Sequence, residues 1–374
     1  MKKLRIAHIT LSMGVGGIES LILNLCESME GENLHFTVVC LDEGGQLLQR
    51  VKDIGAEAIV MERKPGLDVG LIFELVSLFR RRKFDVIHSH NQACAFYAGI
   101  AAFLARVPVS VVTEHSRHNT GDHLVRKLEK KFISMLVHTW VTVSNELAEK
   151  AVAEDLLAER KIKVIVNGVK LQQGLRHNED VIRELGGKFN LEQKIIIVMV
   201  ARLVPIKNHD MMLDALVTLN QDDDRYILLL VGDGPCRETL ELKTHDMNLF
   251  SNVMFLGHRK DITKILSCAD VFVLCSHSEG LPLALLEASS VGVPVVITEP
   301  SNGAGFISDG LNGRVVKQAS VPLAGAIRAC IEASDDSSAM AAVARTKVVR
   351  EYSLEKTVQQ YKDLYLSLLS RTGR

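Results

Sequence analysis

Two glutamates, eight residues apart, lie in a segment whose composition is otherwise that of a protein interior. Glu279 and Glu287 are the only charged residues between Ser278 and Thr298, where leucine, alanine and valine dominate. A carboxylate in such surroundings is costly unless other groups donate hydrogen bonds to it or neutralise it. A ligand with paired hydroxyls, such as a ribose, would supply the donors that Glu287 needs. An ion pair with an arginine or lysine of a neighbouring helix is the alternative.

Two cations in the segment VARLVPIKNHD are the second candidate for chemistry. Arg202 and Lys207 follow an apolar strand, at the end where parallel sheets bind ligands. A guanidinium and an ammonium in this position can clamp a diphosphate, and a solvated loop is the alternative. Further along the chain, Pro282 fits the first position of a helix that we expect to end near Ser290. The free N–H groups of that helix would bind the same anion.

A glycine-rich loop, LSMGVGGIES, follows the first predicted strand. Gly14, Gly16 and Gly17 lead into a predicted helix, where backbone N–H groups and the helix dipole favour a phosphate. The dinucleotide-binding fingerprint G-x-G-x-x-G needs a glycine at position 19, which is Glu19 here. The loop therefore disfavours an NAD-dependent oxidoreductase, and a simple tight turn is as good an interpretation as a phosphate site.

Short apolar strands alternate with amphipathic helical patterns along both halves of the chain. The strand-like runs are LRIAHIT, HFTVVC, AEAIVM, DVIHSH, VSVVT, TWVTV and IKVIV, then KIIIVMV, YILLLV, NVMFL, VFVL, VPVVI and GRVVK. This alternation predicts two α/β domains, each a doubly wound parallel sheet with helices on both faces. A polar stretch at about residues 168–190 is the predicted linker. Ligands bind beyond the carboxyl ends of such strands, so we expect the site in a central cleft between the domains.

Length and composition agree with a globular protein of two domains. The chain has 374 residues, of which 47% are hydrophobic and 24% charged, and its net charge is −1. The low net charge and the aromatic content of 5% argue against nucleic-acid binding. The seven cysteines form no CxxC pair and lie mostly in apolar runs, which indicates free thiols in a reducing, cytoplasmic compartment. We expect neither a signal peptide nor a transmembrane helix.

Several segments together resemble the retaining GT-B glycosyltransferases of family 4. SEGLPLALLEA is similar to their E-x7-E motif, and ARLVPIKN is similar to the segment with their arginine and lysine. Further similar segments follow in the family's order: GVGGIE, DVIHSH, TEH, VTVSN, VIVNGV, LVGDGP, VMFLGHRKDI, CADVFVLCSHSEG, GVPVV and DGLNG. The resemblance runs from about residue 5 to residue 316, and the final segment YSLEKTVQQYKDLY is also similar.

The resemblance implies a GT-B fold, in which two Rossmann-like domains face a central cleft. Residues 1–170 would form an N-terminal, acceptor-binding domain, and residues 171–352 a C-terminal domain that binds the nucleotide sugar. The helix 353–374 would pack back on the N-terminal domain. The implied reaction transfers a sugar, with retention of anomeric configuration, from a UDP- or GDP-sugar to a saccharide or lipid-linked saccharide. Its products would be cell-surface polysaccharides or glycolipids.

The resemblance also implies roles for the charged residues. Arg202 and Lys207 would hold the donor diphosphate and stabilise the leaving phosphate. Glu287 would bind the ribose hydroxyls, and Glu279 would bind the donor sugar. Positive charge grows at the anomeric carbon while the bond to phosphate breaks, so cations already placed at the leaving group should give the largest help.

The remaining implied contacts involve smaller groups. Gly16 and Gly17 would let the N-terminal domain close on the phosphates, and His115 in TEHS would hydrogen-bond the donor sugar near the reacting carbon. On its own, His115 is one of thirteen histidines with no assigned role. Substrate contacts are also implied for the residues after Glu279, which are Gly280, Leu281 and Leu283.

The resemblance leaves the cofactor and the route of retention as expectations. No DxD-like aspartate pair follows a strand, and a cationic pair makes a divalent metal dispensable, so we expect no metal and no cofactor. Front-face attack assisted by the leaving phosphate and a covalent intermediate on Glu279 both stay open. Gly305 stands where the family often has a glutamate that arranges the phosphate loop, which puts the donor sugar in doubt.

Two alternatives belong to other functional classes. A sugar-nucleotide epimerase of similar fold would release an isomerised sugar nucleotide and consume no acceptor. A non-catalytic nucleotide-sugar-binding protein would leave the donor intact. The joint presence of the site residues disfavours the second alternative.

One predicted helix, HLVRKLEKKFISMLVHTW, combines cations with apolar residues. Its cations are Arg126, Lys127, Lys130 and Lys131, and its apolar residues include Leu128, Phe132, Met135 and Leu136. With the segment FRRRKF at Phe79 to Phe84, this helix would lie on an anionic bilayer and bring the protein to a lipid-linked acceptor at the inner face of the cytoplasmic membrane. A solvated basic face is the alternative.

Overall fold

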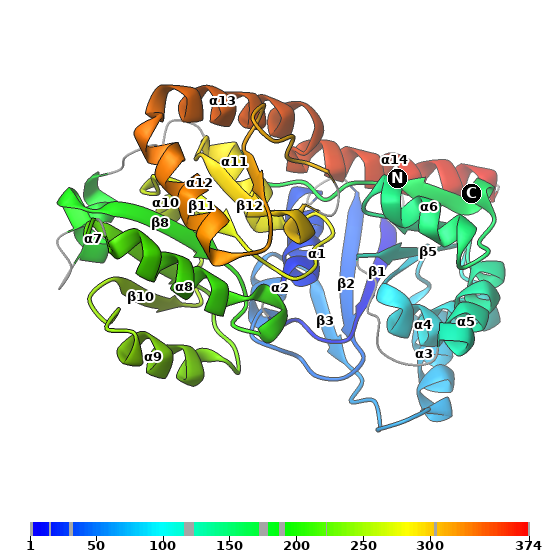
Figure 1. Ribbon diagram of the computed structural model, residues 1–374. Coiled ribbons are helices and arrows are strands. Elements are labelled where there is room, and N and C mark those ends of the chain that lie inside the picture. Colours follow the sequence, from blue (N-terminus) through cyan, green and yellow to red (C-terminus); the bar gives the residue numbers. More distant parts are fainter. Residues whose placement is uncertain are drawn as a thin grey trace. The chain divides into compact units, whose positions relative to one another are not determined.

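The structure is a computed structural model that describes most of the chain. The described residues are 3–14, 16–29, 33–115, 123–171, 179–186, 191–221, 223–302 and 305–372. The chain divides into two compact units, Met1–Asn167 with Leu354–Arg374, and Gly168–Ser353. Much of the predicted linker at 168–190 lies outside the described residues. Figure 1 shows a parallel sheet with helices in each unit, which confirms the predicted fold class.

The sheet of the N-terminal unit has seven parallel strands in the order β3-β2-β1-β4-β5-β6-β7. The strands are β1 (Leu4–Thr10), β2 (Leu34–Cys40), β3 (Glu57–Val60), β4 (Val86–His90), β5 (Val109–Glu114), β6 (Thr139–Thr142) and β7 (Ile162–Val164). The order reverses between β1 and β4, which are neighbours in the sheet but not in the sequence. Loops after these two strands therefore diverge to opposite faces and leave a ligand site at the carboxyl edge.

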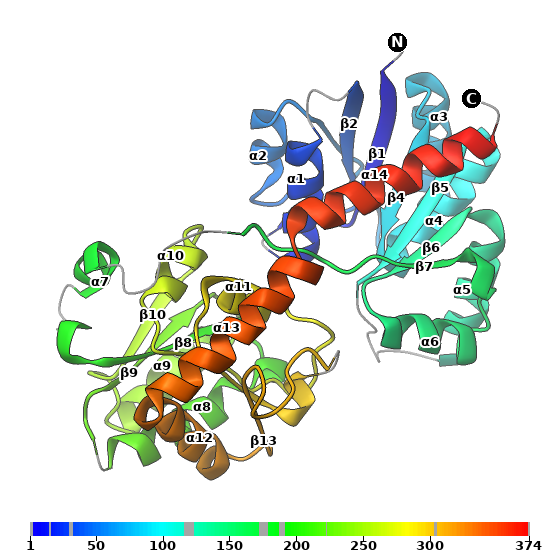
Figure 2. The ribbon, with the colours of Figure 1, turned by 90° about the horizontal axis from the view of Figure 1, so that it is seen from above.

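Helices cover both faces of this sheet. Side chains from alternate positions of β1 pack against α1 (Gly17–Ser28) and α14 (Leu354–Arg371) on one face, and against α3 (Val69–Arg82) and α4 (Asn91–Ala105) on the other (Figure 2). The other helices of the unit are α2 (Leu48–Asp53), α5 (His123–Leu136), α6 (Asn145–Ala153) and the 3-10 turn η1 (Glu159–Lys161). The period-2 alternation of strand side chains explains why one strand serves two separate cores.

The last helix of the chain belongs to the core of the N-terminal unit. Tyr361 and Tyr365 of α14 are fully buried, and their hydroxyls reach buried polar groups of the sheet. The Tyr365 hydroxyl lies 2.7 Å from His88 Nδ1, and the Tyr361 hydroxyl lies 3.1 Å from Thr113 Oγ1. A buried phenol needs such a partner, so these contacts fix the position of α14 on the sheet.

The second unit has a six-stranded parallel sheet in the order β10-β9-β8-β11-β12-β13. Its strands are β8 (Ile195–Val200), β9 (Tyr226–Val231), β10 (Val253–Gly257), β11 (Val271–Leu274), β12 (Val295–Thr298) and β13 (Arg314–Val316). Its helices and turns are α7 (Glu179–Gly186), η2 (Leu191–Gln193), η3 (Pro205–Lys207), α8 (His209–Asn220), α9 (Arg237–Asp246), α10 (Ile262–Ser267), α11 (Leu283–Val291), η4 (Glu299–Ser301), α12 (Ser320–Glu332) and α13 (Ser334–Glu351). The order reverses between β8 and β11, so the loops after these strands flank the expected ligand edge.

Candidate active site

The loop after β8 is held in a fixed conformation by the loop after β9. The Leu203 N–H donates to the carbonyl of Asp233 over 3.0 Å. A Cβ atom on Gly232 would lie 2.0 Å from the carbonyl oxygen of Ala201, and one on Gly234 would lie 2.4 Å from that of Leu203. Both positions therefore require glycine, because any side chain would collide with backbone. The sequence alone predicts no role for these two glycines of the segment LVGDGP. The structure explains them by the close packing of the loops after β8 and β9.

This loop places two cations at the carboxyl end of β8. Arg202 is exposed, and its guanidinium makes no hydrogen bond or ion pair with another described residue. Lys207 ends the turn η3, and its ammonium forms an ion pair with the carboxylate of Glu279. Lys207 and Glu279 follow the adjacent strands β8 and β11, so the sheet topology joins residues that are 72 positions apart.

The Glu279 carboxylate obtains its hydrogen bonds from the protein. Besides Lys207, the Ser276 hydroxyl donates to Glu279 Oε1 over 2.6 Å, and only 11% of the Glu279 side chain is exposed. The Glu279 N–H donates to the carbonyl of Pro300, which fixes the loop to η4. The protein itself therefore supplies the donors and the counter-ion that the buried Glu279 carboxylate needs. Ser276 is a site residue that the sequence did not reveal.

The surroundings of Glu287 differ from those of Glu279. It lies near the middle of α11, half-buried, and no hydrogen bond or ion pair joins its carboxylate to another described residue. Burial raises the pKa of Glu287 to about 7. The alternative of an ion pair with a neighbouring arginine or lysine is thus not met among the described side chains, and Glu287 keeps its capacity to accept hydrogen bonds.

The start of α11 offers free backbone donors. The helix begins at Leu283, and the prediction that Pro282 takes the first helical position is wrong by one residue, because Pro282 is the N-cap with an extended ψ of 127°. The amides of Leu283 and Ala284 donate to no described acceptor, as is usual for a first turn. Gly280 is exposed, and a Cβ atom there would meet nothing within 4 Å, so the loop before α11 leaves open space. Leu281 is half-buried and packs against the core of its unit.

The glycine loop of the N-terminal unit precedes a helix as predicted. Gly16 is the N-cap of α1, and Gly17 is its first residue. A Cβ atom on Gly16 would lie 2.5 Å from Glu19 Oε2, so a side chain would displace that carboxylate. The loop is supported by Gly45, whose φ of +74° and whose contact with the Met13 backbone both demand glycine.

His115 follows β5 in the N-terminal unit and lies beside a second histidine. Its Nε2 atom is 3.0 Å from His90 Nδ1, and its backbone N–H donates to Asn91 Oδ1 over 3.4 Å. Burial lowers the pKa of His115 to about 4, so the ring is neutral at physiological pH. The partner histidine, His90, ends β4 in the segment DVIHSH, for which the sequence alone predicts no function.

The amphipathic helix α5 differs from its prediction in one cation. Lys130 is only 7% exposed and forms ion pairs with Glu114 and Asp155, so it does not belong to the outer basic surface. The prediction that counts Lys130 among the membrane-facing cations of this helix is therefore wrong for this residue. The apolar side chains that α5 does expose are Leu124, Val125, Leu128, Phe132 and Met135.

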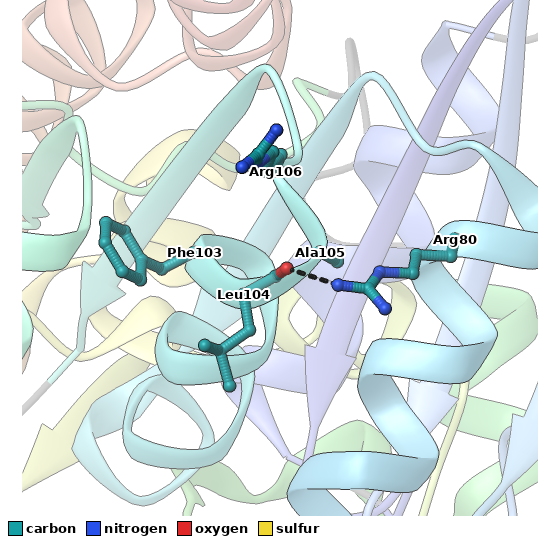
Figure 3. Close-up of a pocket in the computed structure, with 5 residues that line it drawn as sticks. All are labelled: Arg80, Phe103, Leu104, Ala105 and Arg106. Atoms are coloured by element: carbon teal, nitrogen blue, oxygen red, sulfur yellow. Dashed lines mark hydrogen bonds between the residues drawn. The ribbon is translucent and has the colours of Figure 1, made fainter.

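A surface hollow of about 620 Å³ lies in the N-terminal unit near the second basic segment (Figure 3). It is lined by Arg80, Phe103, Leu104, Ala105 and Arg106. Arg80 donates from Nη2 to the carbonyl of Leu104 over 2.9 Å, which fixes the end of α4 to α3. The hollow contains no carboxylate, histidine or hydroxyl among its lining residues, so we assign it no part in the chemistry.

Solved structures with a similar fold define the structural class of this protein. The Anabaena protein Alr3699/HepE, crystallised in complex with UDP and glucose, superposes with a TM-score of 0.81 at 20% identity, covering 97% of this chain and 100% of that one. Such similarity confirms the GT-B fold of two Rossmann-like units. Loops at the carboxyl edge of the second sheet carry Arg202, Lys207 and Glu279.

Sequence relatives then identify the family. The Escherichia coli UDP-Gal:alpha-D-GlcNAc-diphosphoundecaprenol alpha-1,3-galactosyltransferase is 30% identical over 385 residues, which cover 98% of this chain and 98% of that protein. The profile described as Glycosyltransferase Family 4 matches residues 15–173, and that described as Glycosyl transferases group 1 matches residues 182–347. The chain belongs to glycosyltransferase family 4 and is a sugar transferase.

A further relative supports the same class of reaction. The Campylobacter jejuni N,N'-diacetylbacillosaminyl-diphospho-undecaprenol alpha-1,3-N-acetylgalactosaminyltransferase is 26% identical over 300 residues, covering 74% of this chain and 76% of that protein. These relatives are transferases, which favours neither the epimerase nor the non-catalytic alternative. None of the helices in the described ranges is both long and apolar enough to cross a bilayer.

Proposed function

We propose that the protein transfers a hexose or N-acetylhexosamine, with retention of configuration, from a UDP-sugar to a saccharide linked to undecaprenyl diphosphate. The names of the E. coli and C. jejuni relatives support this acceptor, and that of the E. coli relative supports a UDP donor. The observation that carries the proposal is the Lys207–Glu279 ion pair, together with Arg202, which lies on the same loop as Lys207 and whose exposed guanidinium has no partner among the described residues. These groups hold a diphosphate and a sugar at one sheet edge.

The proposed roles follow the charges of the site. Arg202 and Lys207 stabilise the diphosphate as it leaves, and the free amides at the start of α11 add donors to the same anion. Glu279, oriented by Lys207 and Ser276, accepts a hydrogen bond from a donor-sugar hydroxyl. The cations supply the charge that a divalent metal would otherwise supply, so turnover needs no metal. We also propose substrate contacts for Gly16, Gly17 and His115 of the N-terminal unit, with His115 as the hydrogen-bond partner of a sugar hydroxyl.

Transfer assays test the function directly. We expect the purified protein to release UDP from UDP-galactose or UDP-N-acetylgalactosamine only when a polyprenyl-diphosphate-linked saccharide is present, and EDTA should leave the rate unchanged. Proton NMR of the product should show the anomeric configuration of the donor. Release of UDP without an acceptor product, or a product of inverted configuration, would contradict the proposal.

The partner-free carboxylate of Glu287 gives a pH-dependent prediction. Ribose hydroxyls donate hydrogen bonds to the charged carboxylate, so donor binding requires the deprotonated form. Because burial raises the pKa of Glu287 to about 7, the affinity for a UDP-sugar should rise about tenfold between pH 6 and pH 8. Isothermal titration calorimetry in two buffers should also show proton release on binding near pH 7.

The control for this prediction removes the titrating group. Glu287→Gln should bind the UDP-sugar more weakly at pH 8 and lose the pH dependence. The same substitution should stabilise the ligand-free protein slightly at pH 8, because the buried charge of Glu287 destabilises the fold as pH rises from the unfolded value of about 4.5 through about 7. A pH-independent affinity in the wild type would exclude Glu287 as the ribose ligand.

A second part of the proposal concerns the membrane. The side chains Leu124, Leu128, Phe132 and Met135 are exposed along one stripe of α5, next to the exposed Lys131. An apolar stripe beside cations suits the interface of an anionic bilayer, where the lipid-linked acceptor resides. We propose that α5 holds the protein on the inner face of the cytoplasmic membrane.

Vesicle flotation checks the membrane contact. The wild type should float with vesicles of phosphatidylcholine and phosphatidylglycerol, and the double variant Leu128→Ser/Phe132→Ser should stay in the bottom fraction. Phe250→Ser is the control, because Phe250 is a still more exposed phenylalanine, 65% against 44% for Phe132, and belongs to the second unit. Equal flotation of the wild type and the α5 variant would remove this part of the proposal.

A further inference from the structure

Three histidines of the N-terminal unit form a continuous hydrogen-bonded line. His8 lies on β1, His90 ends β4, and His115 follows β5. His8 Nδ1 is 3.0 Å from His90 Nε2, and His90 Nδ1 is 3.0 Å from His115 Nε2. Both pairs of rings are stacked, with centroids 5.3 Å apart. The line therefore crosses three adjacent strands at the carboxyl edge of the sheet.

The two ends of this histidine line differ. His8 is fully buried, and its Nε2 atom has no hydrogen-bond partner in the part of the chain that the structure describes; its ring stacks on Phe36 at 5.8 Å. His115 is only half-buried, and its Nδ1 atom has no hydrogen-bond partner among the described residues. One end of the line is thus closed in the core, and the other is available to a ligand or to water.

The position of each proton follows from this asymmetry. Burial lowers the pKa of His8 to about 3 and that of His115 to about 4, and it holds the pKa of His90 well below its usual range, so all three rings are neutral. Three neutral rings carry three N–H groups, and each of the two links contains one. The third proton must lie at an end. A buried N–H without an acceptor is costly, so the proton belongs on His115 rather than on His8 Nε2.

We propose that His90 and His8 are positioning residues that fix His115 as a neutral donor with its proton on Nδ1. His8 Nδ1–H donates to His90 Nε2, His90 Nδ1–H donates to His115 Nε2, and His115 Nδ1–H is left to donate to a substrate oxygen. His115 is then a hydrogen-bond donor to a sugar hydroxyl and not a general base. The assignment of that hydroxyl rests on the proposed function, but the protonation state of the line does not.

A metal site is the competing use of these side chains. The ring nitrogens of His8, His88 and His90 include a set that lies within 4.8 Å of one another. However, His88 Nδ1 bonds to the Tyr365 hydroxyl and His88 Nε2 to Thr113 Oγ1, both over 2.7 Å. Among the described residues, His8 Nε2 is thus the one of the six ring nitrogens without a protein partner. Because five of the six nitrogens already bond to protein groups, hydrogen bonding accounts for this cluster better than metal binding.

Nitrogen NMR of the wild type decides the protonation state without any assay of activity. In protein labelled with 15N-histidine, and with the His115 signals assigned from their loss in His115→Gln, we expect an N–H signal at Nδ1 and a bare-nitrogen signal at Nε2. The opposite tautomer at His115 would overturn the proposal. Stoichiometric zinc or another metal in the purified protein, lost together with the linked signals on chelation, would also overturn it.

Variants of His90 separate positioning from packing. His90→Phe removes both links, and His115 should then populate the Nε2–H tautomer. His90→Asn places an amide near the former Nδ1 position, so it can still donate to His115 Nε2 and should preserve the wild-type tautomer. His88→Phe is the matched control, because it removes two buried hydrogen bonds in the same cluster but lies outside the line. It should lower the melting temperature and leave the tautomer of His115 unchanged.

Steady-state kinetics of sugar transfer test whether the three linked histidines matter for the reaction. Loss of one neutral hydrogen bond predicts that His90→Phe lowers kcat about tenfold with KM nearly unchanged, and that His90→Asn regains most of the loss. Equal losses in both variants without a change of tautomer would indicate a packing role and contradict the proposal. If the wild type shows no transfer at all, the proposed function fails, while the tautomer of His115 still tests the line.

Discussion

Replacing Lys207 with alanine should lower kcat/KM for sugar transfer by about two to three orders of magnitude, the cost of removing one preorganised group that stabilises transition-state charge. Two effects add. The substitution removes the ammonium from the carboxyl edge of β8, where the diphosphate gains charge as it leaves. It also leaves the Glu279 carboxylate, 11% exposed, without its counter-ion and next to that anion. Initial rates at varied UDP-sugar concentrations measure the loss.

The control for Lys207→Ala is the substitution of another lysine of the second unit. This lysine also forms an ion pair, but it lies outside the candidate site. Lys243 pairs with Asp210 over 2.9 Å on the surface of the second unit, where an ion pair contributes little. Lys243→Ala should keep wild-type kinetics. A Lys207→Ala/Glu279→Gln double variant should recover part of the loss if the unpaired carboxylate repels the diphosphate. Wild-type turnover by Lys207→Ala would show that the cation is structural.

The meeting of Lys207 and Glu279 could be predicted because parallel strands end at the same edge of their sheet. Each residue follows an apolar strand, and the topology makes those strands neighbours. The partner of Glu279 could not be predicted in the same way. The apolar sequence around Glu279 shows that its carboxylate needs hydrogen-bond donors, but not which groups supply them. The contact of Ser276 with Glu279 depends on the backbone conformation of the loop, which the sequence does not reveal.

Helix periodicity explains why the exposed apolar residues of α5 could be predicted and why the position of Lys130 could not. The helix has an apolar outer stripe, but Lys130 shares the inner face with Ile133 and Val137, three and seven residues further on. That spacing is visible in the sequence. What is not visible is the pair of buried carboxylates, Glu114 from β5 and Asp155 after α6, that compensates the ammonium. Hydrophobic pattern alone would therefore place any lysine outside.

The contacts among the three histidines could not be predicted from the sequence either. DVIHSH places His88 and His90 on one face of a strand, because strand side chains alternate with period 2. His8 joins them because β1 and β4 pair with His8 opposite His88. Pairing register between distant strands is set by the packed fold, so the sequence contains the three histidines without revealing their contact.

Replacing Lys130 with methionine should destabilise the N-terminal unit by about 3–5 kcal/mol, the usual cost of removing one partner from a buried ion pair. Glu114 and Asp155 would remain buried without the ammonium of Lys130, while methionine fills most of the volume of the lysine stem. Trp140 donates from Nε1 to Glu114 Oε2 over 3.0 Å and is the single tryptophan of the chain. Urea unfolding followed by its fluorescence therefore reports on this unit.

Two further variants separate the buried charge from the general effect of losing a lysine. Lys131→Met changes the exposed neighbour of Lys130 and should shift the stability by no more than about 0.5 kcal/mol. Adding Glu114→Gln and Asp155→Asn to Lys130→Met removes the stranded charges and should restore much of the lost stability, because amides are less costly to bury than carboxylates. If Lys130→Met were as stable as Lys131→Met, the ammonium would contribute nothing to the anchoring of α5 on the strand that precedes His115.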